Sequence, residues 1–358
     1  MSMQAYNVEI FDRDFDLIQH YNIDSIAYSF DYLSITENVI CIPFNEDVAI
    51  GDYIRIKNDV HEFSGVISRL SVDEAINGFT NVAFKPFISL FDSDIIFDVT
   101  GQGSGSLEDA IGAYITAYFI SNADLDQNIF GLSVESISET DDWTFYITEA
   151  AEGTGKAVIN LVELLQSALQ KYNVAVYITP DFAEKTLTCE IGDKQLASFT
   201  IEGDLPNVIR KSVTVNENKT DTNKLIVMDS GDMTTSITYY LHSDDSYDTS
   251  ATDRIMPVVY EIQTASAFGD KTFAEAAAEA ADKLFGNNKK ANLIEITIQN
   301  NDKMVNPDDL EIGQLVTVIT NGKAYQSVFT GYTIETTTKL IFGTIRLDLT
   351  KILKEAIK

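Results

Sequence analysis

Two stretches of the chain, about 260 residues apart, carry the same short β pattern. The first runs Ile50-Gly51-Asp52-Tyr53-Ile54-Arg55-Ile56, turns at Asn58-Asp59 and continues as Phe63-Ser64-Gly65-Val66-Ile67. The second runs Ile312-Gly313-Gln314-Leu315-Val316-Thr317-Val318, turns at Asn321-Gly322 and continues through Tyr325 to Gly331-Tyr332-Thr333-Ile334. Each reads as strand, tight turn, aromatic residue and strand, with a glycine near both ends. The pattern predicts a duplicated structural module, and no reaction centre stands out beside it.

The composition limits the functions that a protein built on this module can have. A chain of 358 residues that is 45% hydrophobic and 10% aromatic has ample core material for two to four domains. Its 55 acidic and 25 basic residues give a formal net charge of -30, which argues against a protein that grips nucleic acid by neutralising phosphates. The charge suits a surface past which DNA must slide, and it equally suits simple solubility. Both explanations stay open at this stage.

The cysteines and the termini suggest no special chemistry. Cys41 and Cys189 lie in apolar, strand-like runs without metal-ligand spacing, so we expect two buried thiols. The acidic start from Met1 to Asp16 does not resemble a signal peptide. No stretch approaches the roughly 18 apolar residues of a membrane helix, so we expect no membrane insertion by this chain.

Residues 1 to about 98 alternate apolar and polar positions, with turn residues every eight to twelve positions or so, which predicts an antiparallel sandwich or barrel. The glycine-rich segment Thr100 to Gly105 predicts a linker. Ser106 then has the position of a helix N-cap, followed by apolar residues at helical spacing. A second helix is predicted from near Gly155 to Tyr172, and strands at 174–178 and 185–191 complete an α/β region.

Strands are predicted again from Phe199, interrupted by a polar loop and by a third helix at Phe273 to Leu284, which Thr272 caps. Residues 293–298, the second copy of the module and residues 339–349 follow as strands, and residues 350–358 predict a short basic helix or a tail. The fold class expected is therefore α+β, mainly β, with two similar antiparallel β-barrels and a peripheral α/β region.

Apparent site motifs fail on inspection. Gly155-Lys156 resembles the end of a phosphate loop, but Ala150 and Ala157 replace the required Gly and Ser/Thr, so it predicts a glycine-rich lead into a helix. Asp12, Asp14 and Asp16 lack the Gly and Glu of a calcium loop and predict an exposed turn. A solvated acidic loop is favoured over a cation site for four further aspartates: Asp244, Asp245, Asp248 and Asp253.

The three histidines, His20, His61 and His242, have no ligand spacing, and no nucleophile elbow occurs. We therefore expect no catalytic residue, no metal and no cofactor.

The C-terminal third carries a more specific resemblance. An alanine-rich helix at Ala274 to Leu284 and a strand at Leu293 to Ile298 precede the run from Val305 to Val318, the segment Tyr325 to Gly331 and the ending Phe342 to Thr350. With Gly51 to Ile67 as the matching N-terminal signature, the chain resembles the baseplate or tail hub family of phages and prophages, including the N-terminal module of the tail-associated lysin of siphophages. The residues that mark the module are Gly51, Tyr53, Phe63, Gly65, Gly313, Val316, Tyr325, Gly331, Gly343 and Arg346.

The resemblance implies a homotrimer in which each chain supplies two barrels, so that three chains form a ring of six. It implies an N-terminal barrel at 1–99, a peripheral α/β domain at 100–199, a second barrel at 200–235 and 290–349, an insertion at 236–289 and a tail at 350–358. It also implies a distal tail protein or tail tube ring, tail-tip or fibre proteins, and DNA passing without specific binding as partners, in a virion tail made in the host bacterial cytoplasm.

The chain ends just past the hub signature, where tail-associated lysins continue into a lytic module. Either the protein is a non-enzymatic hub or the sequence is a piece of a longer protein; we expect a non-enzymatic hub. A peptidoglycan-degrading or carbohydrate-binding tip protein, and a hub of a contractile tail or injection system, remain as alternatives.

Overall fold

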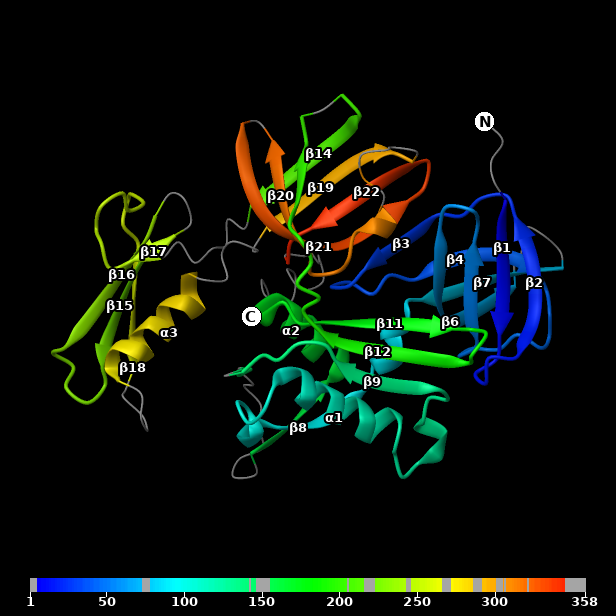
Figure 1. Ribbon diagram of the computed structural model, residues 1–358, viewed down its shortest axis with the longest axis horizontal. Coiled ribbons are helices and arrows are strands. Elements are labelled where there is room, and N and C mark those ends of the chain that lie inside the picture. Colours follow the sequence, from blue (N-terminus) through cyan, green and yellow to red (C-terminus); the bar gives the residue numbers. More distant parts are fainter. Residues whose placement is uncertain are drawn as a thin grey trace.

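The computed structural model describes residues 5–72, 78–141, 143–145, 155–204, 206–215, 223–242, 246–265, 272–285, 292–300, 305, 307–320 and 322–344. Twenty-two strands and three α-helices lie in this part of the chain, and most of the strands belong to two large sheets (Figure 1). The predicted class, α+β and mainly β, is confirmed.

The first sheet holds six antiparallel strands in the order β2-β1-β5-β6-β7-β4 (blue to teal in Figure 1). They are β1 (Tyr6–Phe11), β2 (Leu17–Ile23), β4 (Asn38–Pro43), β5 (Tyr53–Lys57), β6 (Glu62–Val72) and β7 (Phe79–Lys85). Alternating apolar side chains point to one face and form a core that includes Val8, Ile10, Ile54, Ile56 and Phe84. The sheet curls around this core.

The second sheet has the order β13-β20-β21-β22-β19-β14, with β3 as a further strand beside β21. Its strands are β3 (Tyr28–Asp31), β13 (Phe199–Glu202), β14 (Val208–Val215), β19 (Asn292–Gln299), β20 (Leu315–Thr320), β21 (Lys323–Ile334) and β22 (Thr337–Phe342). β13 runs parallel to β20, whereas β1 runs antiparallel to β5, so the second sheet is mixed where an antiparallel one was expected. β3 comes from the N-terminal part of the chain and crosses to this sheet.

The α/β region contains a ribbon of β8 (Asp94–Asp98) with β10 (Lys156–Asn160) and a three-stranded sheet of β9 (Leu132–Ser136), β11 (Ala175–Asp181) and β12 (Thr186–Gly192). Helices α1 (Leu107–Phe119) and α2 (Leu161–Tyr172) pack on them, capped by Ser106 and Asn160. Short 3-10 turns lie at Phe87–Phe91, Val99–Gly101, Leu125–Gln127 and Pro307–Asp309.

Two expectations for this region are wrong. The second helix begins at Leu161 instead of near Gly155, because residues 156–160 pair with β8 as a strand before Asn160 caps the helix. The glycine-rich segment at 100–105 joins β8 to α1 inside one region and is no linker between domains. The hydroxyls of Tyr118 and Tyr114 on α1 accept hydrogen bonds from the amides of Ile96 and Asp98 on β8, which ties its two sides together.

A third unit stands apart in Figure 1: the sheet β17-β16-β15-β18 with helix α3 (Phe273–Phe285) on one face. Its strands are β15 (Lys224–Asp229), β16 (Ser236–Leu241), β17 (Tyr247–Asp248) and β18 (Tyr260–Ala265). β15 was expected in the second barrel as part of 200–235, but it pairs with β16 and β18 because its apolar face, Leu225 and Val227, packs against α3. As predicted, Thr272 caps α3, with Glu275 closing the capping box.

The remaining small predictions have mixed outcomes. Cys189 is buried, and burial raises the pKa of its thiol to about 12, whereas Cys41 is only half-buried. Asp12 accepts hydrogen bonds from the amides of Asp14 and Asp16, so that acidic run is a turn. Within the described ranges no cluster of three His, Cys, Asp or Glu side chains suits a metal ion, and no helix is long and apolar enough to span a membrane. Arg346 and residues 350–358 lie outside the described residues, as do Asp244, Asp245 and Asn321.

Candidate assembly interface

The two copies of the predicted module are hairpins with the same hydrogen bonds. In β5–β6 the amide of Gly51 donates to the carbonyl of Ile67 (2.8 Å), and the amide of Ile67 donates to the carbonyl of Asp52 (2.8 Å). In β20–β21 the amide of Gly313 donates to the carbonyl of Phe329 (2.9 Å), and the amide of Phe329 donates to the carbonyl of Gln314 (3.0 Å). Both glycines have positive φ angles, +96° and +80°, which a side chain would disfavour. The segments around Tyr53 and Val316 therefore share one topology.

The equivalence extends beyond the hairpins. Each long strand has its register irregularity at the same place, between Ile67 and Arg69 in β6 and between Phe329 and Gly331 in β21. β7 and β22 follow as the next strands, and β4 and β19 as the ones after. The order β5-β6-β7-β4 thus repeats as β20-β21-β22-β19, with antiparallel pairing throughout.

The alignment of the second glycine in each copy is different from what the sequence suggests. Ile54 and Val316 hold the same position in the two hairpins, and they lie opposite Gly65 and Ser327, so Ser327 is the counterpart of Gly65. Gly331 follows the register shift of its strand as Arg69 does, so it is the counterpart of Arg69. Ser327 is buried and donates a 2.7 Å hydrogen bond to Asn292. A Cβ on Gly331 would collide with the main chain of β3, at the carbonyl oxygen of Phe30 and 2.8 Å from Cα of Asp31. This glycine is therefore needed for the close approach of β3.

β3 couples the two sheets. Its residues Tyr28 to Asp31 pair with Ile334 to Gly331 of β21, and the hydroxyls of Ser29 and Thr333 lie 3.0 Å apart. The ring of Tyr28 nevertheless stacks on Phe63 in the first core, with 4.1 Å between the ring centroids. Ile334 of β21 is also buried in that first core. The two sheets consequently share side chains along one seam.

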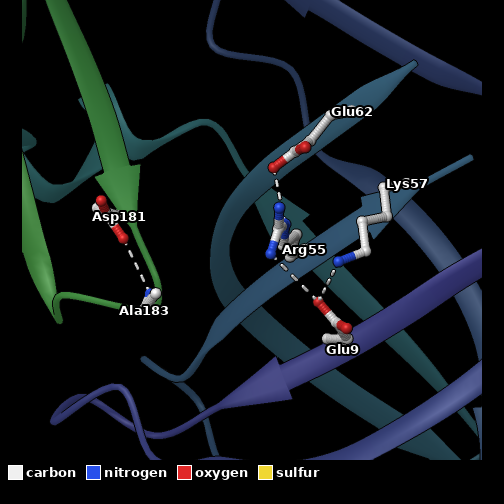
Figure 2. A network of polar contacts seen from close by, with 6 residues as sticks. All are labelled: Glu9, Arg55, Lys57, Glu62, Asp181 and Ala183. Atoms are coloured by element: carbon white, nitrogen blue, oxygen red, sulfur yellow. Dashed lines mark hydrogen bonds and ion pairs between the residues drawn. The ribbon is translucent and has the colours of Figure 1, made fainter. Parts of the chain in front are cut away.

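The tip of the β11–β12 hairpin contacts the outer face of the first sheet. The ring of Phe182 stacks on Phe11 at 4.5 Å, and the guanidinium of Arg55 lies 5.3 Å from the same ring. Figure 2 shows Arg55 between Glu9 and Glu62, with nitrogen–oxygen distances of 3.6 and 2.7 Å, and Lys57 at 3.2 Å from Glu9. These pairs are partly exposed and contribute little to stability, so the aromatic contact is the stronger of the two.

The α/β region also holds the start of the second module. The hydroxyl of Tyr177 donates to the carbonyl of Ile312 (2.7 Å), and Nδ2 of Asn173 donates to the carbonyl of Gly313 (3.1 Å). The hydroxyl of Tyr32, just after β3, accepts from the amide of Val176 (3.0 Å). Burial raises the pKa of both tyrosines, so they stay neutral donors and acceptors at physiological pH.

A cavity of about 280 Å³ lies where the two sheets and the α/β region meet, lined by residues that include Tyr28, Phe63, Tyr177, Lys194, Glu311 and Tyr332. Nζ of Lys194 is 3.4 Å from Glu311 and 3.5 Å from Glu190, and it lies 4.1 Å from the ring centroid of Tyr177. Its charge is thus engaged within the fold. The arrangement joins parts of the molecule.

The described residues that the sequence singled out lie in the strands and turns of the two sheets. Tyr53, Phe63 and Val316 are buried in strands of the two sheets, Tyr325 is half-buried, and burial raises the pKa of Tyr53 to about 12. Gly343, with φ +98°, lies against the main chain of Asn292. Sequence reasoning missed β3 as a strand of the second sheet and missed the contacts of Tyr32 and Tyr177. A short strand that pairs with residues some 300 positions away leaves no local signal.

Comparisons with known proteins give the class of this fold. No protein-family model matches the chain, and no curated protein is similar to it. A structure of the phage P2 baseplate in its activated conformation with Ca contains a similar chain, at 10% identity and a TM-score of 0.53, covering 96% of this chain and 100% of that one. A tail protein from Neisseria meningitidis MC58 is similar at 14% identity and a TM-score of 0.52, and the match covers 94% of this chain and 96% of that one. The 43 kDa tail protein of prophage MuSo2 from Shewanella oneidensis is similar at 13% identity and a TM-score of 0.52, and the match covers 96% of this chain and 98% of that one.

The chain therefore has the fold of phage baseplate and tail proteins. The resemblance to this class that the sequence predicted is confirmed at the level of the fold. The more specific resemblance to the tail-associated lysin stays a prediction.

Proposed function

We propose that the chain is a structural protein of a phage or prophage tail: a homotrimeric hub that joins the six-fold tail tube to the tail tip. The observation that carries this proposal is the repeated strand order β5-β6-β7-β4 and β20-β21-β22-β19 within one chain. Its other partners are then a distal tail protein or tail tube ring on one face and tail-tip or fibre proteins on the other. The protein resides in the virion tail.

The duplication supports a trimer through symmetry. Three chains with two like sheets each supply six similar surfaces, which match a six-fold ring, while the assembly itself keeps three-fold symmetry for the tip. A true mismatch between six-fold and three-fold surfaces would leave buried polar groups unpaired in some subunits, each at about 1–3 kcal/mol. Two like sheets per chain avoid that cost.

The division into parts that we propose follows the sheets. The first ring domain corresponds to the sheet of β1, β2 and β4–β7, within residues 1–99. The second corresponds to the strands at 199–215 and 292–342, and the α/β region of β8–β12 is peripheral. The unit of β15–β18 with α3, residues 224–285, forms the insertion, which is longer at its N-terminal side than the sequence suggested.

The acidic composition supports a passage for DNA through such a ring. A net charge of -30 disfavours the counterion release that retains DNA on a protein, so DNA would pass without specific binding. Changing carboxylates that line the ring to lysine should slow genome ejection in a reconstituted phage. Unchanged ejection would contradict the passage while leaving the structural role intact.

We propose no catalytic role, because the marked residues act in strand pairing and packing. Release of fragments from purified cell wall by the chain would overturn this part of the proposal.

Mass measurement in solution tests the hub directly. Light scattering or sedimentation should give about three times the 39.7 kDa of the chain, and electron micrographs should show a ring with six similar lobes. A persistent monomer at high concentration, alone and with a tail tube protein, would contradict the trimer. A ring of another order would contradict the symmetry argument.

A further inference from the structure

The two like sheets differ at one edge. In the second sheet, Gly331 to Ile334 of β21 pair with β22 on one side and with β3 on the other. The counterpart in the first sheet, Arg69 to Val72 of β6, pairs with β7. On its other side no strand of the described residues pairs with it. Arg69 and Ser71 are exposed there, whereas Gly331 is buried and Thr333 half-buried. An open edge of this kind offers unpaired main-chain groups to another strand.

A pocket of about 260 Å³ adjoins this open edge. It is mainly apolar, and its lining is Ile42, Pro43, Phe44, Asn45, Glu46, Val48, Leu70, Ser71, Thr80 and Val82. Thr80 is only 8% exposed, and its hydroxyl has no hydrogen-bond partner in the described part of the chain. Buried hydroxyl groups in folded proteins are normally paired, so this one indicates a missing partner.

The second sheet shows how the same position is completed. Thr80 pairs with Ile42 of β4, and Thr338 pairs with Ile298 of β19, which is the counterpart of β4. Thr338 is therefore the counterpart of Thr80. The hydroxyl of Thr338 lies 2.9 Å from Oδ1 of Asn300, two residues beyond Ile298. The residue at that place in the first sheet is Phe44, which is 62% exposed, lines the pocket and has no side-chain group that could pair with the Thr80 hydroxyl. The first sheet is therefore incomplete in both its edge and its pocket.

β14 is the strand best placed to complete it. It is the edge strand beside β19, which is the counterpart of β4. In the first half of the chain, β3 comes directly before β4, and β3 is the strand that covers the edge of β21. The main chain of Ser29 in β3 makes two hydrogen bonds, of 2.7 and 2.9 Å, with the side chain of Asn38 in β4. β14 thus lies beside β19 as β3 lies beside β4, although β14 pairs with β19 through its main chain and β3 contacts β4 through the side chain of Asn38.

The side chains of β14 fit the pocket chemically. Ile209 is the extra residue at a register shift against β19 and is 55% exposed. Arg210 beside it is also exposed. The pocket is mainly apolar, its lining includes the exposed acidic residue Glu46, and the next residue along the chain, Asp47, is also exposed. An apolar residue next to a cation complements an apolar pocket next to carboxylates.

We propose that β14 of one copy pairs with the open edge of β6, residues 69–72, in a second copy, with the side chain of Ile209 in the apolar pocket and a main-chain group of β14 as the partner of the Thr80 hydroxyl. This inference rests on the proposed trimer and deepens it, because it assigns the contact between copies. The contact joins the second sheet of one copy to the first sheet of the next. It is therefore heterologous and closes a ring when three copies meet.

Cysteine cross-linking tests the contact. The double variant Ser71→Cys with Ile209→Cys, oxidised in solution, should give covalent dimers and trimers on a non-reducing gel. Each single variant serves as a control for the natural Cys41 and Cys189, and neither should give the ladder. A double variant that is trimeric by mass but does not cross-link would overturn the assigned contact and leave the trimer standing. Monomers of the natural protein at every concentration, alone and with a tail tube protein, would overturn both.

A charge substitution gives a second, independent measurement. Ile209→Asp places an acidic group beside Glu46 and Asp47 and should weaken self-association by about tenfold or more. Leu125→Asp, at a residue that is 77% exposed on the peripheral region, is the matched control and should associate as the natural protein does. Equal association of both variants would overturn the proposal. Circular dichroism shows whether each variant is folded.

The two threonines separate a contact between copies from a contact within the chain. Thr80→Val should leave the melting temperature of the dilute chain unchanged or higher, because it removes an unpaired buried hydroxyl, and should weaken association. Thr338→Val should lower the melting temperature, because it breaks the hydrogen bond to Asn300. If Thr80→Val does not alter association, the hydroxyl has no partner in the second copy, so the main chain of β14 does not reach it and the assigned contact is wrong.

Discussion

The hydroxyl of Tyr177 donates a 2.7 Å hydrogen bond to the main-chain carbonyl of Ile312, at the start of the second module. Tyr177 lies on β11 in the α/β region, so this bond joins two parts of the molecule that are far apart in sequence. Asn173 supports the same turn through the carbonyl of Gly313. The conformation of the β20–β21 hairpin therefore depends on the peripheral region as well as on its own sequence.

Tyr177→Phe tests this dependence. The variant leaves the buried carbonyl of Ile312 without its donor, so we expect the free energy of unfolding to fall by about 1 kcal/mol. Tyr260→Phe is the control, because Tyr260 is 61% exposed, and it should change little. Denaturant unfolding followed by the fluorescence of Trp143, the single tryptophan, measures both variants. Equal effects of the two substitutions would contradict the role of the bond.

Gly331→Ala tests the crossing of β3. The added methyl group would meet the main chain at Phe30 and Asp31, so we expect a loss of about 2–4 kcal/mol and faster hydrogen exchange in β3. Gly231→Ala is the control, since its Cβ would come no closer than 3.4 Å to Asp229. Unchanged protection of the amides of β3 in the Gly331 variant would show that the strand does not need the close approach.

Phe182→Ala tests how the β11–β12 hairpin is held on the first sheet. Because Phe182 is half-buried and stacked on Phe11, we expect a loss of about 1–3 kcal/mol, less than for a fully buried phenylalanine. Glu62→Gln, which breaks the pair with Arg55 in Figure 2, should cost under about 1 kcal/mol. A larger effect of Glu62→Gln than of Phe182→Ala would mean that the ion pair dominates.

Asp52 predicts a dependence of stability on pH. Burial raises the pKa of this carboxyl in the folded state above its value in the unfolded chain, even though it accepts a 2.7 Å hydrogen bond from the amide of Ala49. A raised pKa means that the folded state binds the proton more tightly. The ionised form therefore lowers stability above the folded-state pKa, and this loss disappears as the pH falls toward about 4.

Asp52→Asn removes the charge and keeps an acceptor for Ala49. We expect this variant to be at least as stable as the natural protein at pH 7 and to lose its advantage near pH 4. Asp52→Ala, which leaves the amide unpaired, should be less stable than Asp52→Asn at both pH values. Thermal melts at the two pH values decide the sign. An advantage of Asp52→Asn that grows as the pH falls would contradict it.

The sequence predicted those parts of the fold whose signals are local. The duplication was visible because each copy needs a glycine with positive φ before the strand and an aromatic residue after the turn, as at Gly51 and Phe63. Caps at Ser106 and Thr272 set the starts of two helices correctly. The start of α2 was misplaced, because residues 156–160 read equally well as a helix until β8 pairs with them.

The candidate interface was less predictable. The alignment of Gly65 with Gly331 failed because main-chain crowding, here by β7 and by β3, requires glycine at unrelated places in the two copies. Thr80 and Thr338 were inconspicuous as single residues, and only their registers against Ile42 and Ile298 show that they correspond.

The sequence by itself determined that the chain is acidic, mainly β and built on a repeated hairpin, because periodicity, turn residues and composition are properties of short segments. Only the tertiary structure decided which strands meet: that β3 crosses to β21, that β15 joins α3, and that no strand of the described residues covers the edge of β6 at residues 69–72. The physical reason is that strand pairing between distant segments is chosen by the burial of whole faces and the pairing of main-chain groups across the fold, which no local pattern encodes.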